Sequence, residues 1–240
     1  LNQASEESSG LPVSQPVEEV SLGICSRLDF SGIVWPSDFT FVDRKAMALA
    51  LNITGSFEGN AGWANLANAF DGQGFSLGLS QQNLGQGSLQ PLLIQMLRNK
   101  PGVMRDLFST PNLASLTGML ATWSGGSLSK ASFESAKLAA EPLFPDEVSS
   151  PLDKPSAGVV ETQAISASSA ASVAWAEATL YVDAGKTFKS DWRQSLVALA
   201  ITPGYRTLQV EAAVEMFSRA VGYFDAFGLK ELRSLLVMYD

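Results

Sequence analysis

Apolar residues recur at helical spacing along most of this chain. The clearest case is residues 41–57, where the run AMALALNI is too continuous for a half-exposed face and predicts a central, largely buried helix. Apolar residues on one face predict further helices over 88–99, 112–123, 130–143, 159–182, 190–201, 207–227 and 229–239. Pro101 is expected to stop the helix that precedes it. The pattern therefore predicts a mostly α protein.

The helical pattern fails between Gly72 and Gly87, where glycines recur and QGFSLGLSQ alternates apolar with small or polar residues. Such alternation predicts a short β-hairpin directly after the buried helix, which makes the expected fold α+β. Residues 1–20 are rich in Ser, Glu and Pro and are expected to be a flexible lead-in. Residues 21–240 are then one domain, in which the prolines of 142–158 mark an internal loop.

Composition excludes several classes of protein. The net charge of −8, with no cluster of Lys or Arg, argues against nucleic acid and anionic membrane surfaces as partners. The chain has no His, which excludes His-based triads and most zinc sites, and its lone Cys25 cannot form an intrachain disulfide. No apolar run approaches the roughly 20 residues of a membrane span. We expect neither a metal nor a cofactor.

Two carboxylates stand out by position. Glu58 ends the buried helix, and Asp71 opens the glycine-rich segment. A carboxyl group held partly out of water has a raised pKa and can act as a general acid on a glycosidic bond, while amides and exposed backbone bind the sugar. Asp71 is either the second carboxylate or a turn residue. The candidate substrate ligands are Trp63, Ser76, Gly78, Gln81, Gln82 and Asn83, of which Trp63 is either a stacking platform or a core residue.

These motifs resemble the lysozyme-like superfamily of goose-type lysozymes, lytic transglycosylases and chitosanases. GSFEG followed by FDGQGFSLGLSQQN matches a catalytic Glu followed by a Gly-Leu-Met-Gln-type signature, with Ser80 in place of Met. DGQGFSLG is similar to the DGRG-x-TAG string of the chitosanases, where the second carboxylate lies. The resemblance is closest to bacterial and phage domains with the pattern TGSFEG…FDGQG…LGQGxLQPLL, whose C-terminal motif TPxxRxxQ is echoed by Thr202-Pro203, Arg206 and Gln209.

The resemblance implies a lysozyme-like helical domain in which Glu58 is the general acid of a muramidase or lytic transglycosylase that cleaves the β-1,4 bond of peptidoglycan. Such a protein is expected to be secreted, periplasmic or delivered to the cell wall. Two alternatives remain. A chitosanase-like hydrolase would use Glu58 with Asp71, and the acidic chain would suit polycationic chitosan. A non-catalytic glycan-binding module would account for Ser80 and for a family pattern that continues past Asp240. The oligomeric state stays open.

Overall fold

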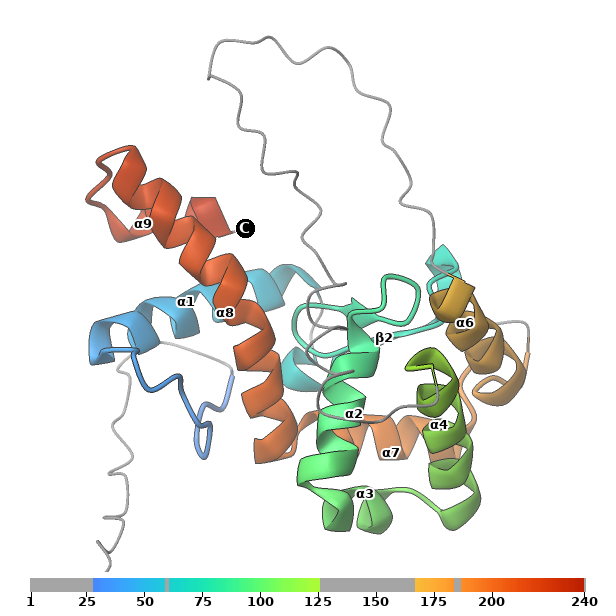
Figure 1. Ribbon diagram of the computed structural model, residues 1–240. Coiled ribbons are helices and arrows are strands. Elements are labelled where there is room, and N and C mark those ends of the chain that lie inside the picture. Colours follow the sequence, from blue (N-terminus) through green and yellow to red (C-terminus); the bar gives the residue numbers. More distant parts are fainter. Residues whose placement is uncertain (1–27, 59–60, 126–166, 184–186, 240) are drawn as a thin grey trace, which may run out of the picture.

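The computed structural model describes residues 28–58, 61–125, 167–183 and 187–239 (Figure 1). This part of the chain is mostly helical with one small antiparallel sheet, which confirms the α+β class. In chain order the elements are α1 (Phe41–Glu58), η1 (Gly62–Ala64), β1 (Leu66–Ala67), η2 (Ala69–Asp71), β2 (Ser76–Leu77), β3 (Gln82–Asn83), α2 (Leu89–Asn99), α3 (Pro101–Leu107), α4 (Thr110–Trp123), α6 (Ala167–Thr179), α7 (Ser190–Ala200), α8 (Pro203–Ala226) and α9 (Leu232–Tyr239). The predicted lead-in 1–20, loop 142–158 and helix 130–143 lie outside the described residues.

The helices follow the predicted apolar segments, with two corrections at prolines. Pro101 does end α2, but α3 begins at the same residue, because proline in the first turn needs no hydrogen-bond partner for the N–H that it lacks. Helix α8 begins at Pro203 rather than near 207, since the side chain of Thr202 caps it by accepting a hydrogen bond from Tyr205 N. No helix among the described residues has the length and apolarity needed to cross a membrane.

The small sheet has the strand order β1-β2-β3, and both pairs are antiparallel. Strands β2 and β3 form the predicted hairpin, joined by the four residues 78–81, which we call the hairpin loop. Strand β1 is an addition that the sequence pattern did not predict. It pairs Leu66 with Leu77, and the next hydrogen bond, from Gly78 N to Asn65 O, fixes the start of β1 beside the hairpin loop.

Two apolar clusters form the core, and the hairpin loop lies where they meet. The main cluster packs the sheet against α2, α3, α4, α6 and α7, and includes Leu77 and Trp192. The second cluster packs α1 against α8 and α9, and includes Leu79 and Trp63. Leu77, at the end of β2, belongs to the first cluster, and Leu79, in the hairpin loop, belongs to the second. Helix α8 joins them, because its first turns contribute Tyr205 to the main cluster and its later turns contribute Val210 to the second.

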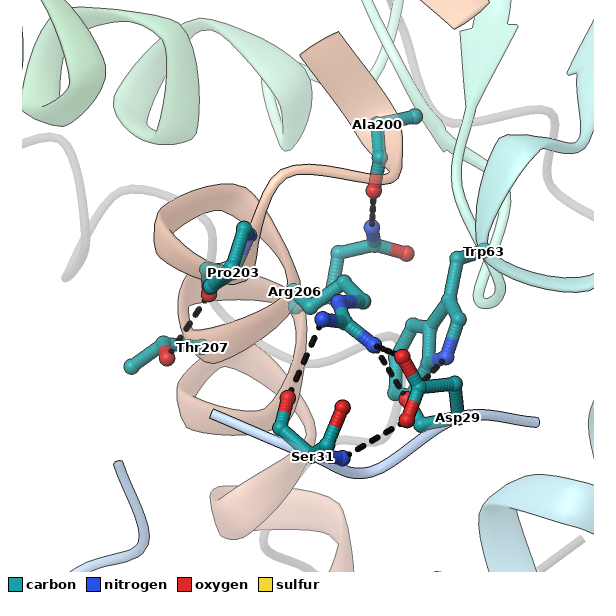
Figure 2. A network of polar contacts seen from close by, with 8 residues as sticks. Asp29, Ser31, Trp63, Ala200, Pro203, Arg206 and Thr207 are labelled. Atoms are coloured by element: carbon teal, nitrogen blue, oxygen red, sulfur yellow. Dashed lines mark hydrogen bonds and ion pairs between the residues drawn. The ribbon is translucent and has the colours of Figure 1, made fainter. Parts of the chain in front are cut away.

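Buried Arg206 on α8 holds the segment that precedes α1 (Figure 2). Its guanidinium donates to the carbonyl and carboxylate oxygens of Asp29 at 2.6 and 2.5 Å and to Ser31 O at 3.0 Å. The Asp29 carbonyl also accepts from Trp63 Nε1 at 2.9 Å. The Arg206 guanidinium and the Asp29 carbonyl oxygen therefore connect three parts of the chain that are distant in sequence: α8, the segment before α1, and η1.

The Asp29 carboxylate is expected to make stability depend on pH. Hydrogen bonds from Ser31 and then Arg206 lower its pKa from 3.8 to about 2. A lowered pKa stabilises the folded protein above the unfolded pKa, and this contribution is lost as the pH falls from about 4 to about 2. Asp29→Asn should therefore lower the free energy of unfolding at pH 7, by a small amount because the carboxylate is largely exposed. Urea unfolding at several pH values checks this, and a deficit that stays constant down to pH 2 would contradict it.

Candidate functional site

The C-terminal end of α1 packs directly on the hairpin loop. Gly55 makes this possible, since a Cβ atom there would lie 2.2 Å from Leu79 Cδ1 and 2.9 Å from Leu79 Cγ. Glu58 is the last residue of α1, about one helical turn beyond Gly55. The backbone of the candidate general acid is therefore at the end of the helix that contacts the loop, although its side chain lies outside the described residues.

Gln209 on α8 holds the other side of the hairpin loop. Its Oε1 accepts a hydrogen bond of 2.7 Å from Leu79 N, and its Nε2 donates one of 3.2 Å to Ala200 O at the end of α7. The side chain is 1% exposed. Gly78 lets this amide approach, because a Cβ at Gly78 would lie 2.4 Å from Gln209 Oε1. The loop is thus clamped between α1 and α8.

We expect Gly78→Ala to be much more damaging than Gly72→Ala. Both glycines have positive φ, 90° and 77°, so both substitutions strain the backbone by roughly 1 kcal/mol. Only the new Cβ at residue 78 meets another group, since nothing lies within 4 Å of the position at Gly72. Displacing the buried Gln209 amide should cost about 2 kcal/mol more. Chemical denaturation of both variants measures the difference, and equal losses of stability would refute the steric argument.

Four of the predicted ligands in the hairpin are buried, Gly78 among them. Ser76, Gln82 and Asn83 are 5%, 8% and 6% exposed. The Asn83 amide is used locally, because its Oδ1 accepts from Gln86 N at 2.8 Å and its Nδ2 donates to Gln86 Oε1 at 3.0 Å. Gln82 Oε1 is buried without a hydrogen-bond partner among the described residues. Asn83 therefore shapes the turn after the hairpin, and Gln82 keeps an unused acceptor close to the loop.

Gln81 is the half-buried ligand candidate and has an unusual backbone. Its φ of 50° is the only positive value at a non-glycine residue in the described part of the chain. A left-handed glutamine costs roughly 1 kcal/mol, and such strain gathers at functional sites because the surrounding structure must hold it. The clamp on Gly78 and Leu79 provides that restraint.

The two remaining candidates have structural contacts. Trp63 is 5% exposed, donates to the Asp29 carbonyl oxygen and packs edge-on against Phe30, so the core alternative holds and no ring face is open for stacking. Asp71 is exposed, and its Oδ1 accepts a 3.0 Å hydrogen bond from Gln73 N, which is the turn-forming alternative. Phe70, beside Asp71, is 81% exposed and is the aromatic ring that a sugar could reach here.

A cavity of about 440 Å³ lies beside β1. One side is formed by Leu66, Ala67 and Asn68, and the other by Thr187, Phe188 and Arg193. Among these described residues, Asn68 and Thr187 are polar and belong to loops, and Arg193, on α7, is the one charged residue. The described part of the wall is therefore amphipathic, with one cation.

Sequence reasoning missed the residues that hold the site together. Gly55 interrupts an otherwise strongly apolar helix, which is a signal of close packing, and Gln209 is a polar residue within an apolar face of the helix predicted from 207. Arg206 and Gln209 were singled out only by the family pattern, and the structure gives both a role: each holds a distant segment against α8. Arg193 carried no signal, because only the fold brings α7 to β1.

Among the described residues no three His, Cys, Asp or Glu side chains are grouped so that they could hold a metal ion. Comparison of the chain with protein-family models, with curated proteins and with solved structures finds no match. The chemistry of the site is therefore inferred from its own residues.

Proposed function

We propose that this protein cleaves the β-1,4 glycosidic bond of peptidoglycan with Glu58 as general acid. The observation that carries the proposal is the contact between Gly55 and Leu79, which puts the end of the helix that bears Glu58 beside a glycine-rich hairpin loop. A glutamate at a helix end next to a β wall is the arrangement expected of a lysozyme-like site. Cell-wall glycan as substrate requires that the protein be secreted, periplasmic or delivered to the wall.

In this mechanism the Glu58 carboxyl group donates its proton to the glycosidic oxygen as the bond to the anomeric carbon breaks. The half-buried Gln81 would bind the sugar, whereas Gly78 is buried and its N–H and carbonyl oxygen are bonded to Asn65 and Gln81. Asp71 is exposed, and one of its carboxylate oxygens accepts a hydrogen bond from Gln73 N. This favours a mechanism in which Glu58 is the only catalytic carboxylate. Glu58 then acts first as acid and afterwards as base, while the acetamido group of the substrate stabilises the positive charge. The product of that route is an anhydro sugar.

The decisive experiment is product analysis by mass spectrometry after incubation with purified sacculi and, separately, with chitosan. Transglycosylation leaves anhydro ends that are one water lighter than the reducing ends made by hydrolysis. Release of fragments from sacculi supports the proposal, and release from chitosan alone would assign the chitosanase-like alternative. Retention of the protein on sacculi without any product would indicate a glycan-binding module instead.

A further inference from the structure

Among the described residues that line the cavity beside β1, Arg193 is the one cation, and it is available to a ligand. Its guanidinium makes no hydrogen bond or ion pair with another described residue. The acidic residues closest to it in sequence each accept a hydrogen bond from elsewhere. Asp191 accepts a 2.8 Å hydrogen bond from Asn112 Nδ2, and Asp183 accepts from the N–H of Thr187 at 2.7 Å and from its hydroxyl at 3.3 Å. The cavity therefore offers a guanidinium whose N–H groups are not used by another described side chain.

The walls of the cavity are held in place by the core. Arg193 follows Trp192, which is 2% exposed and packs edge-on against Phe108 and Trp175, so the position of α7 is fixed. Phe188 pairs with Tyr181 in a β-bridge and packs against its ring at 4.7 Å between centroids. The backbone that carries Arg193 and the apolar wall are therefore preformed, while the exposed guanidinium is free to turn toward a ligand.

The cavity is also close to the candidate catalytic end of α1. Asn65 is hydrogen-bonded to Gly78 at the hairpin loop, and Asn68 lines the cavity. Three residues of extended chain span roughly 10 Å. Helix η1, between Glu58 and β1, contacts both α1 and α7. A polymer bound at the loop and running along β1 would therefore present its next unit to Arg193.

We propose that this cavity is a subsite for a carboxylate-bearing unit of the glycan, with Arg193 as its ligand. A guanidinium matches a carboxylate through two parallel N–H···O bonds, and it is the group of choice for such recognition. The proposal rests on the proposed function and narrows its substrate class, because chitosan carries no carboxylate. The carboxylate is either the free lactyl group of a muramic acid or a carboxyl group of the attached peptide.

Isothermal titration calorimetry on the full chain carrying Glu58→Gln, which slows turnover, tests this with three probes. They are a peptide-free muramic-acid oligosaccharide, a muropeptide of the same sugar length, and fully N-acetylated, neutral chitotetraose. Adding Arg193→Gln should weaken binding of the carboxylate-bearing probe about tenfold, because a charge-assisted hydrogen-bonded pair is lost. Binding of chitotetraose should be unchanged. Arg233→Gln removes the same charge from an exposed position on α9 and should change neither. Which of the two acidic probes responds identifies the source of the carboxylate.

Arg193→Lys keeps the positive charge but loses the planar guanidinium that can form two parallel hydrogen bonds, so it should bind the acidic probe with intermediate affinity. This variant separates the effect of charge alone from that of the paired hydrogen bonds. Equal binding of acidic and neutral probes, no binding of any probe, or no effect of Arg193→Gln would each overturn the subsite. Because binding is measured separately from turnover, a subsite that depends on Arg193 in a protein that never cleaves sacculi would reject the catalytic proposal alone. Circular dichroism confirms that each variant is folded before the comparison is made.

Discussion

Replacing Glu58 with glutamine is expected to slow the release of fragments from sacculi by about 10²–10⁴-fold, the usual contribution of a general acid. Glutamine has nearly the same shape but no transferable carboxyl proton. The residue stands at the C-terminal end of α1, where a helix has no need of a negative charge, so stability should not fall. Rates are measured as soluble fragments released per time from sacculi, together with the midpoint of thermal unfolding.

Glu215→Gln is the matched control, since Glu215 is an exposed residue of α8 and the substitution makes the same change of charge. It should leave the rate unchanged. Full activity of Glu58→Gln would show that another group donates the proton. A wild-type protein that releases nothing from sacculi would instead contradict the proposed function itself.

Except for α3, which no predicted segment covers, the described helices could be predicted from the sequence because they depend on local apolar periodicity. The run AMALALNI predicted α1 and its burial, and Met47, Ala48, Ala50 and Leu51 are indeed at most 1% exposed. Strand β1 could not be predicted in this way, because two residues carry no period and its partner Leu77 becomes adjacent only in the fold. Pro101 ends α2 as predicted, but the sequence did not predict that helices begin at Pro101 and Pro203, because proline breaks a helix only in its interior and is tolerated in its first turn.

The order of the candidate site, helix end followed by hairpin, could also be predicted, whereas the accessibility of its side chains could not. Trp63 shows why, since a tryptophan near a catalytic glutamate fits either a sugar platform or the core, and only the contacts with Asp29 and Phe30 decide. Asn83 has the right chemistry for a sugar ligand, but its amide hydrogen-bonds to Gln86 within the same turn. Whether such an amide hydrogen-bonds within its own turn or to a ligand cannot be predicted from the sequence pattern.

Replacing Gln209 with leucine is expected to lower the free energy of unfolding by about 2–6 kcal/mol, because two buried backbone groups lose their partners at about 1–3 kcal/mol each. Leu79 N would lose its acceptor, and Ala200 O at the end of α7 would lose its donor. Both residues are at most 1% exposed, so water does not replace the amide without opening the core. Leucine is apolar and similar in size, which leaves packing nearly unchanged and isolates the hydrogen bonds.

Gln194→Leu is the control for this change, since it makes the same substitution at an exposed position of α7 and should alter stability by no more than about 0.5 kcal/mol. Urea denaturation gives both values. Hydrogen exchange then locates the effect: in Gln209→Leu the amide of Leu79 should exchange much faster relative to helix amides in α2. If Gln209→Leu is as stable as the wild type, the clamp does not hold the hairpin loop, and the strained backbone of Gln81 must be maintained by α1 alone.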